Sequence, residues 1–438
     1  MKAFLGRIWS NVVESFWFVP ALMSVTAVIG SIFLIALDRN GDWASVALVW
    51  SGGASGARSL LSTVATSMIT VAGTVFSITI AALTLASQQF GPRLLRNFTV
   101  DRGNQIVLGT FVSTFLYCLM ILRTIRGQNE GQFVPNLSVS IAVLLACASL
   151  CVLIYFIHHL SSSIQAENLL ASVGGDLRDD LQRLSPPAPT APGDREPEKA
   201  LPRRAPQPIV SAGSGYIQRI DREELVSIAE EADLLLQLPL RPGDFVSVGE
   251  TLIEGWTGEP HAEIDDAVKG RLRDTIQLGE RRTPWQDARY GVRQLTEIGA
   301  RALSPGTNDP FTAMGCLDWL IDALGELAGR KAPTGIAFGS NGNMRLVEQP
   351  VTFAELLALG IDPFREYGGN SVILACHMMQ LLGRLARRAS HEEHRQAVLH
   401  EARSALDFAE NNLPSEADRM RVREGFKSVE AVIEGSAP

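Results

Sequence analysis

Charged residues are scarce in the first 160 positions of this 438-residue chain. That part holds 9 of the 39 basic and 5 of the 47 acidic residues, so its formal charge is +4. The remaining 30 basic and 42 acidic residues give the rest of the chain a charge of −12. Because charge is divided so unevenly, the average of −8 describes neither part, and a single soluble globule is excluded.

Four stretches of the first part have no charged residue at all: 16–37, 59–92, 103–122 and 137–157. A helix of about 20 residues crosses the roughly 30 Å hydrocarbon core of a bilayer. A charged side chain at the centre of such a helix costs about 2.5–3.5 kcal/mol. We therefore predict an α-helical integral membrane domain with four transmembrane helices over residues 1–160.

Cysteine is also rare, with five residues in the whole chain. Cys118, Cys147 and Cys151 fall inside the uncharged stretches, which leaves Cys316 and Cys376 for the soluble part. A large exported domain would more often carry paired cysteines. The basic residues of the loops point to the same orientation. Five Lys or Arg flank the spans on the side of the N-terminus and four flank them on the other side, and basic loops are more often cytoplasmic. Both observations favour cytoplasmic N- and C-termini.

The soluble remainder changes composition along its length. Residues 161–184 continue the fourth span as a helix that leaves the membrane, and residues 185–208 form a Pro-rich linker that cannot bury a core. Residues 209–257 are typical of short strands and turns. Residues 258–438 show helical periodicity. We therefore predict a mixed cytoplasmic domain, in which a small β-rich unit precedes a helical region.

Turn and capping residues predict where individual strands and helices of this domain begin and end. Residues 215–220 are typical of a strand, and Asp221, with a glutamate three positions later, predicts the start of a short helix. Residues 241–253 have a strand–turn–strand pattern, which we interpret as a β-hairpin. In the helical region we predict one helix over residues 285–303 and another that begins after Asp309 as its N-cap.

Motifs of enzymes and cofactor sites are missing. The chain has no GxxxxGK[ST] phosphate loop, no GxSxG nucleophile elbow and no CxxC pair. His391 and His394 lack the HExxH spacing of zinc hydrolases, so we interpret them as part of a solvated helix face. The acidic remainder offers no broad basic face for nucleic acid. We expect no enzymatic activity, no metal, no cofactor and no nucleic-acid partner.

The second span carries the most informative pattern, at positions separated by steps of 4, 3, 4, 3, 4, 3 and 4. Seven of the eight positions hold a hydroxyl or amide side chain, and we call them the polar seam: Thr63, Ser67, Thr70, Thr74, Ser77, Thr84 and Gln88. This spacing places them on one side of a helix. The uncharged run has 34 residues, or about 50 Å as a helix, so it extends past the hydrocarbon core.

Two interpretations of the polar seam stay open. In the first, copies from three or more subunits surround a pore, and hydroxyl oxygens replace part of the hydration shell of an inorganic ion. In the second, small and hydroxyl side chains allow helices to approach closely and to hydrogen-bond across their interface. Neither interpretation excludes a homo-oligomer in the lipid bilayer.

Arginines stand at both ends of this span, with Arg58 at one end and Arg93 and Arg96 at the other. Rings of arginine at the mouths of a pore would favour anions, whereas the acidic remainder would concentrate cations nearby. The same arginines can anchor the helix at the lipid headgroups. The sign of a transported ion therefore stays open.

Six strings of the sequence are long and specific enough to compare with known families, among them ALSPGTNDPF near residue 305. They occupy residues 65–80, 87–98, 101–105, 155–160, 241–245 and 301–311. Through them, most of the chain except the Pro-rich linker resembles a bacterial family of predicted membrane proteins of unknown function (DUF2254). The resemblance implies a protein of the bacterial inner membrane, and it brings no known activity, cofactor or catalytic residue.

The sequence thus predicts an oligomeric inner-membrane ion channel or transport protein. The second span would line the pathway, and the cytoplasmic domain would serve assembly or gating. The alternative is a non-conducting membrane sensor or scaffold whose cytoplasmic domain binds a protein or a small ligand. The oligomeric state separates the two, because a central pore needs three or more copies of one lining helix.

Overall fold

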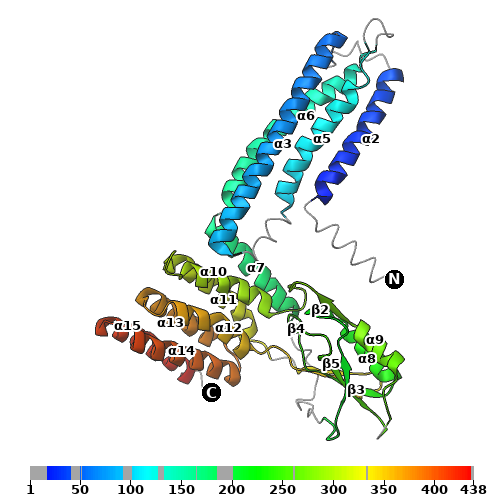
Figure 1. Cartoon of the computed structure of the whole chain (residues 1–438). Helices are drawn as coiled ribbons and strands as arrows, with labels where there is room; N and C mark the ends of the chain where they lie inside the picture. The colour runs from blue at the N-terminus through cyan, green and yellow to red at the C-terminus, as the bar shows by residue number, and fades with distance from the viewer. Residues whose placement is uncertain are drawn as a thin grey trace. The chain divides into compact units, whose positions relative to one another are not determined.

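The computed structural model describes residues 17–40, 50, 52–91, 101–126, 133–163, 165–184, 201–259, 262–331 and 334–435. The chain divides into two compact units, Met1–Asn168 (unit 1) and Leu169–Pro438 (unit 2). Unit 1 is made of long helices, and unit 2 combines small sheets with a stack of helices (Figure 1).

Four apolar helices form unit 1 (Figure 1): α2 (Phe18–Asn40), α3 (Ala54–Phe90), α5 (Arg102–Leu122) and α6 (Asn136–Ser163). Each is long and apolar enough to cross a membrane, so the prediction of four long apolar helices is confirmed. Helix α5 contacts the other three. Half of its most apolar stretch is buried, a larger share than in α2, α3 or α6. It is therefore the centre of the bundle.

Asp38, near the end of α2, connects that helix to the start of α6. Its carboxylate accepts hydrogen bonds from the backbone N–H of Leu137 at 2.9 Å and of Ser138 at 3.0 Å. These N–H groups lie in the first turn of α6, where the helix itself offers them no acceptor. Negative charge is also favourable at this end of a helix. Asp38 therefore caps a helix that begins about a hundred residues later in the chain.

Two small sheets form one part of unit 2 (Figure 1). The first has five strands in the order β1-β5-β3-β8-β7, and the second has three in the order β4-β2-β6. Of the strand pairs, β3 with β8 is parallel and the others are antiparallel. The strands are β1 (Gln207–Val210), β2 (Gly215–Ile220), β3 (Leu234–Leu238), β4 (Phe245–Val246), β5 (Thr251–Thr257), β6 (Ile276–Gly279), β7 (Ile336–Phe338) and β8 (Met344–Glu348).

The sheets share one apolar core with two short helices, α8 (Arg222–Glu231) and α9 (Asp266–Asp274). Asp221 caps α8 by accepting a hydrogen bond from Glu224 N, which confirms the predicted helix start. Strands β6, β7 and β8 come from the stretch after residue 257 that we assigned to the helical region. They are only three to five residues long, too short to show alternation against the helical pattern around them.

The interpretation of residues 241–253 as a hairpin is wrong. Strands β4 and β5 are present in this stretch, but β4 pairs with β2, whereas β5 pairs with β1 and β3. The turn between them is held by the preceding loop, because Gly249 N donates to Ser211 O at 2.9 Å. Gly249 has a φ of +82°, which favours glycine. A local pattern indicates strands, but it does not say which strands pair.

Six helices stack side by side in the rest of unit 2, and α7 (Ala166–Leu184) packs against them (Figure 1). They are α10 (Arg289–Ala302), α11 (Pro310–Ala328), α12 (Phe353–Tyr367), α13 (Val372–Arg388), α14 (Glu392–Asn412) and α15 (Glu416–Glu434). Asp309 caps α11 by accepting from the N–H of Phe311 and Thr312, both at 3.1 Å, as predicted. Helix α13 contacts α11, α14 and α15.

Helix α10 begins at Arg289, four residues later than predicted. Asp287 explains the difference, because its Oδ1 accepts from the backbone N–H of Arg289 at 3.1 Å. The other carboxylate oxygen accepts from Arg282 Nε at 3.0 Å. Arg289 also donates to Asp244, in the turn before β4, at 2.7 Å. These four side chains, the Asp287 cluster, join the sheets of unit 2 to its helices.

Candidate functional site

The polar seam lies on the side of α3 that faces away from the rest of unit 1. All seven of its residues are exposed: Thr63, Ser67, Thr70, Thr74, Ser77, Thr84 and Gln88. Six residues that precede seam positions by two are buried: Leu61, Ala65, Ala72, Val75, Ala82 and Ala86. Two residues turn an α-helix by about 200°. The seam and the buried face are therefore on opposite sides of α3.

Alanines make up most of the buried face of α3. Ala72 and Val75 lie in one apolar cluster with Phe111 of α5 and Phe156 of α6. The larger apolar residues of α3 are exposed instead and flank the seam: Ile69, Phe76, Ile78, Ile80 and Leu85. Together with Leu61 and Val75, the alanines are separated by steps of 3, 4 and 7 residues, which keep one face of a helix toward its neighbours.

Five of the six seam hydroxyls donate hydrogen bonds to the backbone of their own helix. Thr70 Oγ1 lies 2.8 Å from Thr66 O, and Thr74 Oγ1 lies 3.1 Å from Thr70 O. Thr63, Ser77 and Thr84 make the same bond to the carbonyl four residues earlier, at 2.8–2.9 Å. A hydroxyl has one donor and two acceptor lone pairs. With the donor used, these oxygens have only acceptor capacity left for a ligand on the exposed side.

Two further hydroxyl residues belong to the same exposed region of α3. Ser62 and Thr66 are exposed and lie beside seam positions 63 and 67. They lie outside the strict three- and four-residue spacing of the seam, because each is one residue away from a seam position. They widen the polar surface in the N-terminal half of α3.

The three predicted pore-mouth arginines differ in what the structure shows of them. Arg58 lies near the start of α3, and its Nη2 donates to Ile125 O at 2.9 Å, just beyond the end of α5. Unpaired carbonyls at a helix end are suitable partners for a basic side chain. Arg58 therefore connects α3 to α5. Arg93 and Arg96 lie outside the described residues.

Asp101 and His159 form a hydrogen-bonding contact that the sequence did not predict. Asp101 is the N-cap of α5 and accepts from Gly103 N at 2.7 Å. Its Oδ2 also lies 2.7 Å from His159 Nε2 near the end of α6. A Cβ at position 103 would lie 2.6 Å from His159 Nε2, so glycine leaves room for this approach. The pair connects α5 to α6 at the end of the bundle opposite Asp38.

Removal of the Asp101 carboxylate is expected to destabilise unit 1. Asp101→Ala loses both the cap and the contact with His159, and the loss of an N-cap costs about 0.5–2 kcal/mol. We expect a lower melting temperature for the full-length protein in detergent, measured by circular dichroism. Asp101→Asn, which keeps a capping oxygen, should melt closer to the wild type. Equal melting of Asp101→Ala and the wild type would contradict this role.

Those histidines of unit 2 that the structure describes show no arrangement for metal chemistry. Within the described ranges, no group of three or more His, Cys, Asp or Glu is placed to hold a metal ion. His394 is only 4% exposed, and its Nδ1 lies 3.1 Å from Ala328 O. Its ring packs on Phe353, with 4.5 Å between ring centroids. The interpretation of His394 as part of a solvated face is therefore wrong, because its helix face is covered by α11 and α12.

Comparisons with known proteins give one family model and several relatives. Residues 13–384 match the family model described as predicted membrane protein (DUF2254). Uncharacterized proteins of Mycobacterium bovis and Mycobacterium tuberculosis are 32% identical to the chain over 392 residues, which cover 88% of this chain and 74% of theirs. No solved structure matches the chain. The chain thus belongs to the DUF2254 family of predicted membrane proteins.

Proposed function

We propose that this protein is an oligomeric ion channel or a related transport protein of the bacterial inner membrane. Three or more copies would surround a pathway lined by the polar seam of α3. One observation carries the proposal: the seam residues are exposed on the side of α3 opposite its buried face. In a single copy, a row of hydroxyls along the membrane would face lipid, where polar groups are unfavourable. A water-filled pathway removes that cost.

The orientation of the hydroxyls supports cations as the transported ions. Five of the seam hydroxyls use their donors within α3, so their oxygen lone pairs are available to the pathway, and oxygen ligands replace the hydration shell of a cation. The charge of −12 on the rest of the chain supports the same sign, because a cytoplasmic unit 2 would attract cations to the inner mouth. Unit 2 would assemble or gate the pathway.

Current recordings test this proposal. Purified full-length protein in planar bilayers should give unitary currents with a reversal potential on the cation side in a salt gradient. Thr74→Phe places a ring on the seam and should lower unitary conductance severalfold. Ile69→Phe is the matched control, since Ile69 is exposed beside the seam, and it should conduct like the wild type. Silence over wide voltage, tension and ion conditions, or full conductance in Thr74→Phe, would refute the proposal.

Thiol labelling and mass measurement give independent readouts. Thr74→Cys, in a variant without the native cysteines, should react with a membrane-impermeant thiol reagent if position 74 faces water. A hydroxyl seam that packs helices would instead protect this cysteine. A monomer or dimer in native mass spectrometry would favour the alternative, a non-conducting sensor or scaffold, because two helices do not enclose a central pathway.

A further inference from the structure

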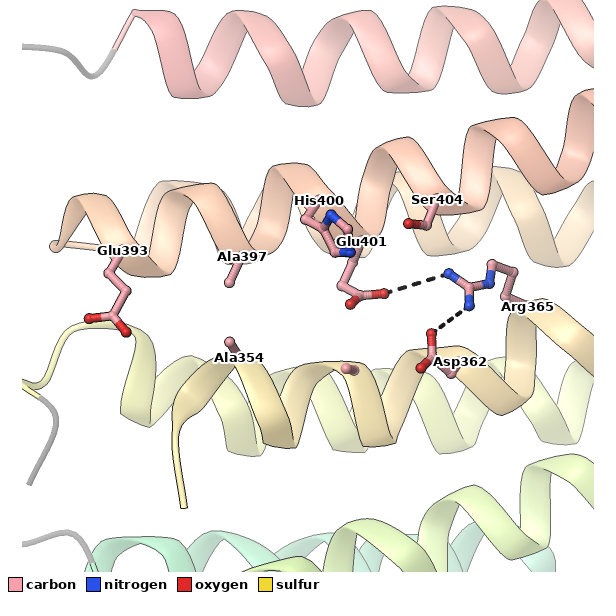
Figure 2. A pocket seen from close by; sticks show the side chains of 9 residues that line it. Ala354, Asp362, Arg365, Glu393, Ala397, His400, Glu401 and Ser404 are labelled. Carbon is pink, nitrogen blue, oxygen red and sulfur yellow. Dashed lines mark ion pairs between the residues drawn. The ribbon is translucent and has the colours of Figure 1, made fainter. Parts of the chain in front are cut away.

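A pocket opens between α12 and α14 in unit 2 (Figure 2). Its volume is about 470 Å³, and residues of both helices line it. Three of these are alanines, Ala354 and Ala358 on α12 and Ala397 on α14. Because each alanine side chain is a single methyl group, this part of the pocket is apolar and leaves room for an aliphatic chain.

Glu401 lines the pocket, and one of its carboxylate oxygens has no hydrogen-bond donor. It extends from α14 toward α12 (Figure 2) and is 5% exposed. Its Oε2 has no hydrogen-bond partner, and Arg365 Nη1 is 4.0 Å away. Arg365 is closer to Asp362, at 2.7 Å. A buried acceptor without a donor is unfavourable, so a ligand that supplies a donor here would be stabilised.

A second carboxylate stands at the other end of the alanine-lined part. Glu393 is exposed and lies eight residues before Glu401 on α14, which is about 12 Å along the helix axis. Arg365 forms ion pairs with both Asp362 and Glu401, and the pair with Asp362 is the shorter, at 2.7 Å against 4.0 Å (Figure 2). The pocket therefore presents two acidic groups, Glu393 and Glu401, separated by the apolar surface of Ala397 and its neighbours on α12.

We propose that this pocket binds a linear aliphatic dication of the polyamine class. One ammonium group donates hydrogen bonds to Glu401, the other pairs with Glu393, and the methylene chain lies on the three alanines. An ammonium group has three donors and no acceptor, which suits a carboxylate. A monoamine would leave one carboxylate without a partner, and a short diamine would not reach both. The site thus selects for charge at both ends and for length.

Calorimetric titration of the purified full-length protein in detergent tests the ligand class. The probes are 1,8-diaminooctane, 1,4-diaminobutane and octylamine. We expect the long diamine to bind at least about tenfold more tightly than the other two, because each of these loses one charge-assisted contact. Equal affinity for the three amines, or no binding of the long diamine, would overturn the proposal. The titration does not depend on conduction, so its result is separate from that of the channel proposal.

Variants and pH test the two carboxylates. Glu401→Gln and Glu393→Gln should each weaken binding of 1,8-diaminooctane about tenfold. Glu424→Gln removes an exposed carboxylate on α15 and should leave the affinity unchanged. Burial raises the pKa of Glu401, nearby Asp362 adds to this, and Arg365 and His400 oppose it without reversing the direction. Binding to the wild type should therefore weaken as pH falls through that pKa, more steeply than in Glu401→Gln. Wild-type affinity for 1,8-diaminooctane in both pocket variants would overturn the proposed site. Because Glu393 is exposed, Glu393→Gln should fold.

Discussion

Asp287→Ala is expected to lower the free energy of unfolding of unit 2 by about 3–5 kcal/mol, the cost of breaking a buried ion pair. The Asp287 side chain is 1% exposed and accepts from Arg282 and Arg289, whose side chains are 13% and 11% exposed. Without it, Arg282 loses its carboxylate, and the backbone N–H of Arg289 loses its acceptor. The turn before β4 lies directly against this carboxylate, because a Cβ on Gly243 would meet it, so the substitution also removes the group on which the turn packs.

Thermal melting of the full-length protein in detergent measures this effect. For a unit of this size, the loss corresponds to a fall of about 10 °C in melting temperature. Asp274→Ala is the matched control, since Asp274 is exposed at the end of α9, and it should stay within about 0.5 kcal/mol of the wild type. If both variants melt like the wild type, the Asp287 cluster does not hold the sheets and helices of unit 2 together.

The helices of unit 1 could be predicted because their signal is local. A stretch such as 59–92 has no charge, and the structure has one helix, Ala54–Phe90, over nearly the same residues. The contacts between helices could not be predicted in this way. Asp101 and His159 are 58 residues apart, and nothing in either neighbourhood indicates the other. The same limit explains β4 and β5, whose strand character was predicted correctly and whose partners were not.

The same difference between local signals and long-range contacts applies to the candidate sites. The spacing of the polar seam was sufficient to place Thr63 to Gln88 on one side of a helix, because helical periodicity follows from chain geometry. Which side packs against α5 depends on residues such as Ala72, and this needed the structure. The pocket of Glu401 was not predicted, since it requires α12 and α14 to lie together, and they come from separate parts of the chain.

Gly299→Leu is expected to destabilise unit 2 by about 3 kcal/mol or more, at the upper end of the cost of overpacking a core. Gly299 lies inside α10, and a Cβ there would be 2.1 Å from Cε1 of Phe364 on α12. Phe364 is 1% exposed, so its ring has no free space to move into. Leucine forms helices better than glycine by about 1 kcal/mol, and this gain is too small to offset the clash.

Gly270→Leu makes the same change where nothing opposes it. Gly270 lies inside α9, and a Cβ there would meet no atom within 4 Å. Helix propensity alone then applies, so this variant should be as stable as the wild type or more stable by up to about 1 kcal/mol. Thermal melting of both full-length variants gives the comparison. Changes in stability of opposite sign for the two substitutions would show that α10 and α12 approach closely because Gly299 has no side chain. Changes of the same sign would contradict this packing.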